Sequence, residues 1–457
     1  MCFFFPIRDI MKLFGTSGIR GLYGDTVTEE LALKVGMAIG SLVDGPVAVG
    51  MDSRTSGPCL KAALVSGILS RGCDVYDVGL APTPSVGVAI RAYGCSAGVV
   101  ITASHNPAPY NGIKVWDSRG VAHLGLEGRI EEMIAESSYA GATWDGMGLV
   151  HEVSCLDKHM EGIMSSVSLD GTYTVAVDCG CGAGSVITPY VLERMGMRVI
   201  SLNCQPSGMF PRGLEPNAVN LSGLCHAVRA YGCDIGVAND GDADRIGAVD
   251  ERGEYIPYDV LLSLMARHAC EHASSPSRVV VTTVDASMCL DDYVADAGGT
   301  VVRTRVGDVA LAQDVVGRGA IFGGEPSGTW IFPETWLTPD GVLAAVKLLE
   351  LKDAGIRLCD ERESIPSYHT LREKIPICAV DRTAFEDTLV KELAREPYDE
   401  LLTIDGIRVA YDDAWALYRF SGTEPLFRIT VEARDKARAA DLMERAMRHV
   451  EVVRRKQ

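Results

Sequence analysis

The 457-residue sequence has no long apolar run, no excess of positive charge and no CxxC cysteine pair, and each absence excludes a class of protein. No stretch approaches the ~20 apolar residues of a membrane-spanning helix. The formal net charge is −18, whereas a general nucleic-acid binder needs a basic surface. We therefore expect no membrane span and no nucleic-acid partner. An anionic small molecule is still compatible with this charge if arginines and lysines gather locally.

The 14 cysteines are scattered along the chain. The apolar start, Met1–Pro6, is too short for a signal peptide and lacks a basic leader. Free thiols in a reducing, cytoplasmic location are the simplest interpretation. A metal site at Cys179, Cys181 and Cys204 is the alternative, but the paired spacing of zinc sites is missing. Met11 is a plausible true start, so we expect residues 1–10 to be a dispensable extension.

A loose repeat indicates three similar α/β domains. Each copy is an apolar strand that ends in Asp and runs into a loop of small residues: Val47–Arg54, Val175–Gly180 and Val279–Ser287. A second apolar strand follows each copy and leads to a polar loop: Thr102–Pro107, Asn239–Arg245 and Gly323–Gly328. Helical patterns lie between the paired strands, as expected of βαβ units with covered sheets. Ligands gather at strand ends in such sheets.

The last hundred residues follow a different pattern. A hairpin is expected around Asp412-Asp413, then an alternating strand at 428–432 and a helix over 436–453. This order is α+β. We therefore expect α/β domains at 1–150, 151–250 and 251–363, and an α+β domain at 364–457. The sequence also predicts a helix start at 338–340, with Thr338 as a cap and Gly355 as the stop.

The loop Asn239–Arg245 carries three carboxylates, Asp240, Asp242 and Asp244, at alternating positions. When the loop curls, they can converge on one hard cation. An EF-hand is disfavoured because its sixth position needs glycine and here is Arg245. A solvated acidic turn is the plain alternative. Magnesium is favoured, since a few carboxylates and a phosphate oxygen complete its octahedron.

Ser104 lies in a loop that leaves an apolar strand, with His105 beside it. A hydrolase nucleophile elbow would read GxSxG, which this loop does not. A phosphate-carrying serine fits better, because it needs a divalent cation, local positive charge and a general acid/base. Lys114 is a candidate for the last of these if it is desolvated; otherwise it is a solvated lysine.

Three further loops carry polar groups. The segment Arg419–Pro425 combines hydroxyls, a glycine and a guanidinium, which together can cradle a phosphate, and Arg428 adds charge. The carboxylate and hydroxyl of Gly323–Gly328 suit adjacent sugar hydroxyls, although a plain turn is equally compatible. The glycine-rich loop Gly15–Gly21 does not match the nucleotide-binding GxxxxGK[ST] pattern.

Together these segments resemble the α-D-phosphohexomutase family. The matching segments occur in the family's order over essentially the whole chain: Phe14–Gly21, Thr102–Pro107, Asp240–Arg245, Gly324–Gly328 and Arg419–Pro425. The resemblance implies three similar α/β domains, with mixed sheets sandwiched by helices, plus a C-terminal α+β domain, around a central cleft. Pro326 and Thr329 make the sugar loop look most like archaeal-type phosphoglucosamine mutases.

The resemblance also implies roles for individual residues. Ser104 would be the phosphoserine and one ligand of a single Mg²⁺, with Asp240, Asp242 and Asp244 as the others. Arg20, His105 and Arg245 would line the centre, and Lys114 would be the general acid/base. The expected sugar and phosphate contacts are Gly307, Asp308, Glu325, Ser327, Arg419, Ser421, Gly422, Thr423 and Arg428.

By this resemblance the chain is a hexose-phosphate isomerase. Phospho-Ser104 would give its phosphoryl group to the sugar, form a hexose 1,6-bisphosphate and recover the other phosphate. Glucosamine 6-phosphate is the expected substrate, with mannose and glucose phosphates as the runner-up. The other classes weighed are a non-catalytic, metal-dependent sugar-phosphate-binding protein and a serine hydrolase. A monomer or a homodimer is expected.

Overall fold

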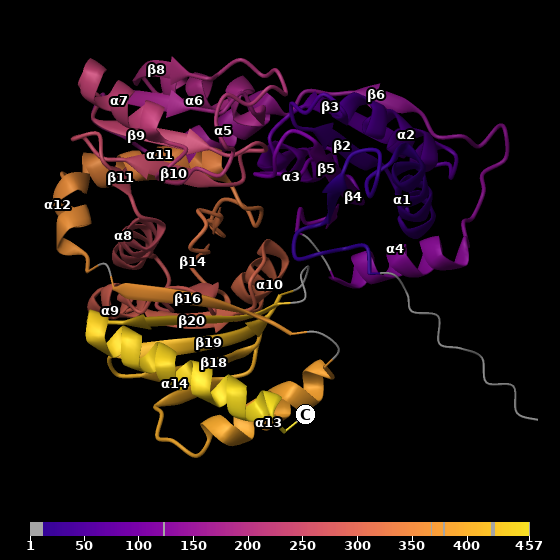
Figure 1. Ribbon diagram of the computed structural model, residues 1–457. Helices are drawn as coiled ribbons and strands as arrows, with labels where there is room; N and C mark the ends of the chain where they lie inside the picture. The colour runs from indigo at the N-terminus through magenta and orange to yellow at the C-terminus, as the bar shows by residue number, and fades with distance from the viewer. Residues whose placement is uncertain (1–11, 122–123, 367, 378–379, 422–425, 457) are drawn as a thin grey trace, which may run out of the picture. The chain divides into compact units, whose positions relative to one another are not determined.

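The computed structural model describes residues 12–121, 124–366, 368–377, 380–421 and 426–456. The chain forms two compact units, which are described separately. One unit comprises Met1–Pro257 and Ser327–Asp360, and the other comprises Tyr258–Pro326 and Glu361–Gln457. Figure 1 shows four sheets, each accompanied by helices. No helix among the described residues is long and apolar enough to cross a membrane.

The first sheet has the strand order β1-β5-β4-β2-β3-β6. It is mixed, because β1, β5 and β4 pair antiparallel whereas β4, β2, β3 and β6 pair parallel. The strands are β1 Ile19–Leu22, β2 Val47–Met51, β3 Val75–Leu80, β4 Ala97–Ile101, β5 Tyr110–Asp117 and β6 Val150–Glu152. The helices of this region are α1 Glu29–Leu42, α2 Gly57–Leu69, α3 Thr83–Ala92 and α4 Leu124–Glu136.

Helices cover both faces of this sheet. Val47 and Val49 of β2 join one apolar core with side chains of α1, α2 and α4. The alternate residue, Gly50, faces α3, and a Cβ at Gly50 would lie only 2.6 Å from Val86. Successive strand residues thus point to opposite, covered faces. The continuous apolar strands follow from this double burial.

The second sheet has the order β11-β10-β9-β7-β8 and is also mixed. Its strands are β7 Thr174–Asp178, β8 Arg198–Leu202, β9 Ile235–Asn239, β10 Ile246–Val249 and β11 Tyr255–Ile256. The accompanying helices are α5 Leu156–Ser166, η1 Ala183–Val186, α6 Thr188–Arg194, α7 Ser222–Tyr231 and α11 Gly341–Asp353. Leu224 and Val228 of α7 share a core with Ala176, Ala238 and Val249 of the sheet.

Helix α11 differs from the predicted start by its cap. Asp340, not Thr338, accepts the Val342 and Leu343 N–H groups, at 2.8 and 2.9 Å. The Thr338 hydroxyl instead donates to the Gly120 carbonyl oxygen at 2.8 Å. Gly355 follows the helix with a φ of 80°, as the predicted stop requires.

In the second unit, β12 (Val279–Thr283) lies between β13 (Thr300–Thr304) and β14 (Phe322–Gly324), and both pairings are parallel. The helices of this region are α8 Tyr258–Glu271, α9 Cys289–Asp296 and α10 Asp308–Arg318. The short strand β15 (Trp330–Ile331) belongs to the first unit. Helix α12 (Leu358–Ser364) begins in the first unit and ends in the second.

The C-terminal sheet is fully antiparallel, in the order β16-β20-β19-β18-β17. Its strands are β16 His369–Pro376, β17 Glu400–Leu402, β18 Ile407–Tyr411, β19 Ala414–Phe420 and β20 Leu426–Ala433. Its helices are α13 Arg382–Leu393 and α14 Lys436–Arg454, which share a core with the sheet. The predicted hairpin is confirmed, because Tyr411 and Ala414 are partners across Asp412-Asp413.

The expected fold class is therefore confirmed: α/β sheets of mixed direction are followed by an α+β region. The domain limits at residues 150, 250 and 363 stay predictions, and so does the central cleft. The extension at residues 1–10, Gly422 and Thr423 lie outside the described residues.

Candidate active site

Two polar loops of the first unit meet at Ser104. Ser104 follows β4, and Asp240 follows β9 in the second sheet. The Ser104 hydroxyl donates to Asp240 Oδ2 at 2.6 Å, and both residues are buried. Ser104 has a φ of 49°, in the left-handed region that is unfavourable for a serine. Backbone strain of this kind is maintained only where the surroundings enforce it.

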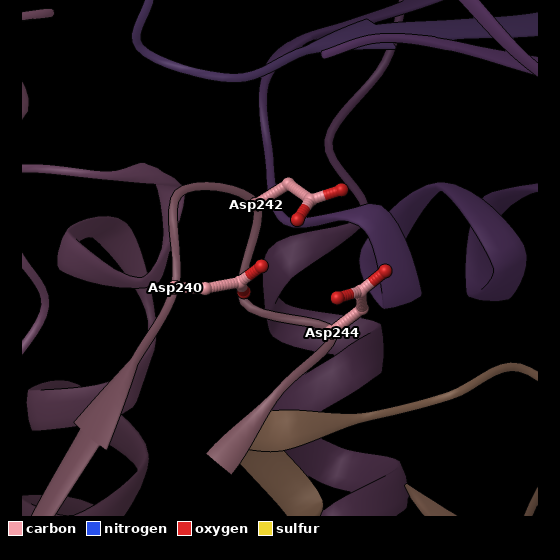
Figure 2. A group of neighbouring side chains, drawn as sticks. All are labelled: Asp240, Asp242 and Asp244. Atoms are coloured by element: carbon pink, nitrogen blue, oxygen red, sulfur yellow. The ribbon is translucent and has the colours of Figure 1, made fainter. Parts of the chain in front are cut away.

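The carboxylates of Asp240, Asp242 and Asp244 converge at the end of this loop. Figure 2 shows the three side chains gathered around a common space, and one oxygen of each lies within 4.8 Å of the others. All three residues are buried, so the solvated acidic turn is rejected. Among the described residues, Cys179, Cys181 and Cys204 form no such group.

Two oxygens of this triad are suited to a cation. Asp242 Oδ1 and Asp244 Oδ1 are buried and have no hydrogen-bond partner. Burial and the charges of its two neighbours raise the pKa of Asp240 well above its ordinary value. A cation among these oxygens would relieve both the repulsion and the lost hydration. The triad therefore fits a divalent metal ion.

Lys114 is buried, not solvated, and lies beside the triad. It projects from β5, and its Nζ donates to Asp242 Oδ2 at 2.8 Å and to Asp244 Oδ2 at 2.5 Å. Burial by itself would raise the pKa of Asp242, but the Lys114 ammonium and the Thr83 hydroxyl lower it below the ordinary value. Burial and Asp242 raise the pKa of Asp244, against the opposing effect of Lys114.

His105 lies between Ser104 and Glu215. Its Nδ1 is 3.4 Å from Ser104 Oγ, and its Nε2 is 3.6 Å from Glu215 Oε2. Burial and the guanidinium groups of Arg245 and Arg20 lower the pKa of His105 to about 2. The imidazole is therefore neutral at physiological pH.

Positive charge gathers around the serine loop. Arg245 Nη1 donates to both carboxylate oxygens of Glu215, each at 2.9 Å. Arg20, on β1, donates to the Ser17 carbonyl at 3.1 Å and to Asn106 Oδ1 at 3.4 Å. Arg20 of β1 and Arg245, which precedes β10, thus both act on His105 of the serine loop.

Glu325 of the sugar loop is buried and accepts the Gly307 N–H at 2.7 Å. This contact joins the segment after β14 to the start of α10, where Asp308 is the first helical residue. Glu325, Gly307 and Asp308 are thereby brought together in the second unit. Ser327 belongs to the first unit, and its hydroxyl lies 3.3 Å from that of Thr329.

The C-terminal polar loop begins between two arginines. Arg419 and Arg428 are direct partners across β19 and β20. Like charges in this position repel unless an anion offsets them. Asp405 contacts Arg419 with both oxygens, at 2.9 and 2.8 Å, and Arg428 lies 3.3 Å from the Ser421 hydroxyl. Arg419, Ser421 and Arg428 thus lie together at the start of this loop.

Four site residues were not predicted from the sequence. Arg382 donates to the Ser421 carbonyl at 3.4 Å. Glu215 pairs with Arg245, Thr83 donates to Asp242 Oδ2 at 2.6 Å, and Arg54 contacts the serine loop. Only Arg54 had a sequence signal, as the end of the first repeat copy. The others lie far from the motifs they support.

Comparisons with known proteins place this geometry in a family. Four models described as phosphoglucomutase/phosphomannomutase match the chain. Three are α/β/α domains, I over residues 11–140, II over 157–253 and III over 257–366, and the fourth is the C-terminal domain over 378–449.

Relatives match over nearly full length. A probable phosphoglucosamine mutase of Pyrococcus abyssi is 50% identical over 439 residues, which is 95% of this chain and 97% of the relative. One of Thermococcus gammatolerans is 48% identical over 448 residues, covering 97% and 99%. A crystal structure of a phosphoglucomutase/phosphomannomutase family protein from Burkholderia thailandensis superposes with a TM-score of 0.86 at 26% identity, covering 97% and 98%. This chain therefore belongs to the α-D-phosphohexomutase family.

Proposed function

We propose that this protein is a phosphohexomutase that interconverts glucosamine 6-phosphate and glucosamine 1-phosphate through phospho-Ser104. The observation that carries the proposal is the 2.6 Å contact between Ser104 Oγ and Asp240, at the edge of the buried triad. A serine in that position can carry a phosphate whose oxygens face a metal ion. The names of the relatives, at 48–50% identity, support glucosamine as the sugar.

One Mg²⁺ per chain would be held by Asp240, Asp242, Asp244 and the phosphate on Ser104. These are hard oxygen ligands, and two of the carboxylate oxygens lack hydrogen bonds. When bound, the ion supplies charge neutralisation at the transferring phosphoryl group. Arg20 and Arg245 would contribute further positive charge around the same phosphate.

In the forward step, the free hydroxyl of the sugar phosphate attacks the phosphorus of phospho-Ser104. The bond between phosphorus and Ser104 Oγ breaks as the new oxygen–phosphorus bond forms. Lys114 is proposed as the general acid/base: as the neutral amine it takes the hydroxyl proton, and it gives that proton to Ser104 Oγ as the serine leaves. The product is a hexose 1,6-bisphosphate, which turns over and returns its other phosphate to Ser104 by the reverse chemistry.

Further residues are proposed to hold the rest of the substrate. Glu325 and Ser327, with Gly307 and Asp308, are proposed to bind sugar hydroxyls. Arg419, Ser421, Gly422, Thr423 and Arg428 are proposed to bind the phosphate that is not reacting. The cross-strand pair of arginines supports this assignment, since a bound phosphate dianion offsets their repulsion.

A serine hydrolase is the second candidate function, because His105 lies between Ser104 and Glu215, as in a serine–histidine–carboxylate triad. The two separations, 3.4 and 3.6 Å, are longer than the 2.6–3.2 Å of a catalytic triad. The Ser104 hydroxyl donates its hydrogen bond to Asp240, and the pKa of His105 is lowered to about 2. His105 is therefore a poor general base, which favours the mutase.

The proposal is tested by turnover with glucosamine, mannose and glucose 6-phosphates after priming with glucose 1,6-bisphosphate and Mg²⁺. We expect glucosamine 6-phosphate to give the largest kcat/KM, and Ser104→Ala to abolish turnover. Intact mass should show about 80 Da added to the wild-type chain alone. A folded protein with no phosphate on Ser104 and no turnover of any sugar would instead support a binding protein. Faster turnover of mannose or glucose phosphate would select the runner-up.

A further inference from the structure

Arg54 is a buried arginine whose guanidinium donors are all used, four of them on the segment that contains Ser104. It follows β2 by three residues and is 1% exposed. Its Nε donates to Asp52 Oδ2 at 3.0 Å. The two terminal nitrogens donate to four carbonyl oxygens between the end of β4 and the first residue of β5: Ser104 at 2.8 Å, Asn106 at 2.6 Å, Pro107 at 2.7 Å and Tyr110 at 2.9 Å.

The five contacts account for the five N–H groups of a guanidinium. Four carbonyl oxygens that converge on one point repel one another unless a cation lies among them. A lysine would offer only three donors without the planar arrangement. The sequence positions 104–110 therefore hold their conformation around this one side chain.

A second set of contacts holds the backbone N–H of Ser104. Asp52 Oδ2 accepts the Thr102 hydroxyl at 2.6 Å, and Thr102 Oγ1 accepts the Ser104 N–H at 2.9 Å. The amide and the carbonyl of Ser104 are thus both tied to the Asp52–Arg54 ion pair. These ties act on the backbone and leave the Ser104 hydroxyl outside the network.

Ser104, the residue that these contacts hold, has a strained backbone. Its φ is 49°. Its carbonyl oxygen also packs against the loop of the three aspartates, since a Cβ at Gly241 would lie only 2.5 Å from that oxygen. The Phe210 ring covers the Arg54 guanidinium, with a centroid distance of 5.3 Å. Rotation of Ser104 out of the left-handed region would move Oγ away from Asp240.

We infer that Arg54 is a positioning residue of the mutase reaction: it holds Ser104 in its left-handed conformation, so that Oγ faces the carboxylate triad for phosphoryl transfer. The inference rests on the proposed function. Arg54 has no contact with Asp240, Asp242 or Asp244 in the structure. Its effect on the chemistry therefore passes through the loop backbone.

The test is Arg54→Lys, with Arg71→Lys as the matched control. Arg71 lies in the same domain and donates to the Ala140 carbonyl, outside the site. We expect Arg54→Lys to lower kcat about 100-fold, the effect of a displacement of about 1 Å at a reacting atom. The KM for the sugar phosphate should stay within threefold, because the substrate contacts are unchanged. The rate of Ser104 phosphorylation by glucose 1,6-bisphosphate, followed by intact mass, should fall in parallel with kcat.

The rates are normalised to the folded fraction, which circular dichroism measures. If the kcat of Arg54→Lys is then within threefold of the wild-type value, the inference about Arg54 is wrong. If Arg54→Lys does not fold, Thr102→Val decides, since it removes the tie to the Ser104 N–H at nearly constant volume. An unchanged phosphorylation rate in Thr102→Val overturns the inference, and at least a tenfold loss supports it. A wild-type protein that neither accepts phosphate nor isomerises sugars would instead defeat the proposed function.

Discussion

At the scale of single residues, Asp240 and Asp244 oppose folding in the absence of a cation, because burial and neighbouring negative charge raise the pKa of each carboxyl. The raised pKa of Asp240 means that the folded state favours its protonated form. The ionised form therefore costs stability once pH rises above the ordinary carboxyl value of about 3.9, and the cost grows up to the raised pKa. Removing that charge should stabilise the metal-free protein at neutral pH.

We therefore predict that Asp240→Asn raises the stability of the metal-free protein by at least about 1 kcal/mol at pH 7, and that the gain vanishes below about pH 4. The same variant should weaken Mg²⁺ binding at least about tenfold, because one charged ligand is lost. Thermal unfolding with EDTA and with graded MgCl₂ measures both effects. Glu193→Gln, an exposed change on α6, is the control. A less stable metal-free Asp240→Asn protein would contradict the prediction.

Glu215 gives a second residue-scale prediction. Its carboxylate holds Arg245 with two contacts of 2.9 Å, and a neutral amide keeps only one acceptor. We expect Glu215→Gln to lower kcat/KM about tenfold, which corresponds to one charge-assisted hydrogen bond of about 1.4 kcal/mol. Steady-state kinetics on glucosamine 6-phosphate provide the measurement. Glu161→Gln on the exposed face of α5 should have no effect, and equal losses in both variants would rule out a local role for Glu215.

The residues that the sequence identified are those within short motifs. Ser104, the three aspartates, Arg20, Arg245 and Lys114 all lie in the first unit. Their chemical roles stay predictions. Arg54, Thr83 and Glu215 escaped because hydrogen bonds between distant segments have no local sequence pattern. The contact of Lys114 with two aspartates joins positions 128 and 130 residues apart.

At the scale of elements, Asp340 connects the start of α11 to two other helical segments. Its Oδ1 accepts two helix N–H groups, and its Oδ2 contacts His159 Nε2 and Trp336 Nε1, each at 2.8 Å. His159 Nδ1 in turn lies 2.8 Å from the Ser85 hydroxyl of α3. All of these side chains except Trp336 are fully buried or nearly so.

We predict that Asp340→Ala lowers the free energy of unfolding by about 2–4 kcal/mol, since a cap and two buried hydrogen bonds are lost together. The control is Asp381→Ala, a cap on α13 that accepts one N–H, from Ala384 at 3.1 Å. That exposed cap should cost only about 0.5–1 kcal/mol. Urea unfolding monitored by circular dichroism compares the two variants. Similar losses in both would show that the buried network adds nothing.

Element boundaries followed the local pattern where one conformation was clearly favoured. The apolar strand expected before the Ser104 loop is β4, Ala97–Ile101, and the turn at Asp412-Asp413 was placed correctly. The cap of α11 was misassigned, because Thr338 and Asp340 are both good caps and only the contact with Gly120 diverts Thr338. Local propensity cannot choose between two adequate caps when a tertiary partner decides.

At the scale of the whole molecule, the chain has separate cores in its two units. The core around the first sheet and that around α7 involve residues of the first unit. The C-terminal core and the cluster of Val284, Met288, Trp415 and Leu417 belong to the second. The acidic triad lies in the first unit only.

We therefore predict two thermal transitions, of which Mg²⁺ shifts only one. At a free concentration of 100 times Kd, the metal should stabilise the first unit by about 2.7 kcal/mol. Differential scanning calorimetry measures the shift. Trp415 is 1% exposed and lies in the second unit, so its fluorescence changes when that unit unfolds. The transition that loses its fluorescence change in Trp415→Phe is therefore that of the second unit. A single transition, or an equal shift of both, would contradict the prediction.

The sequence by itself determined the fold class, the order of the polar loops and the family, because strand periodicity and short motifs depend on neighbouring residues. Tertiary structure decided which polar side chains are buried together. Only the folded chain shows that Lys114 is buried against the triad and that Arg54 donates to the carbonyl of Ser104, whose φ is positive. Burial, charge pairing and backbone strain arise when segments distant in the sequence come into contact. A local sequence pattern does not show which residues make those contacts.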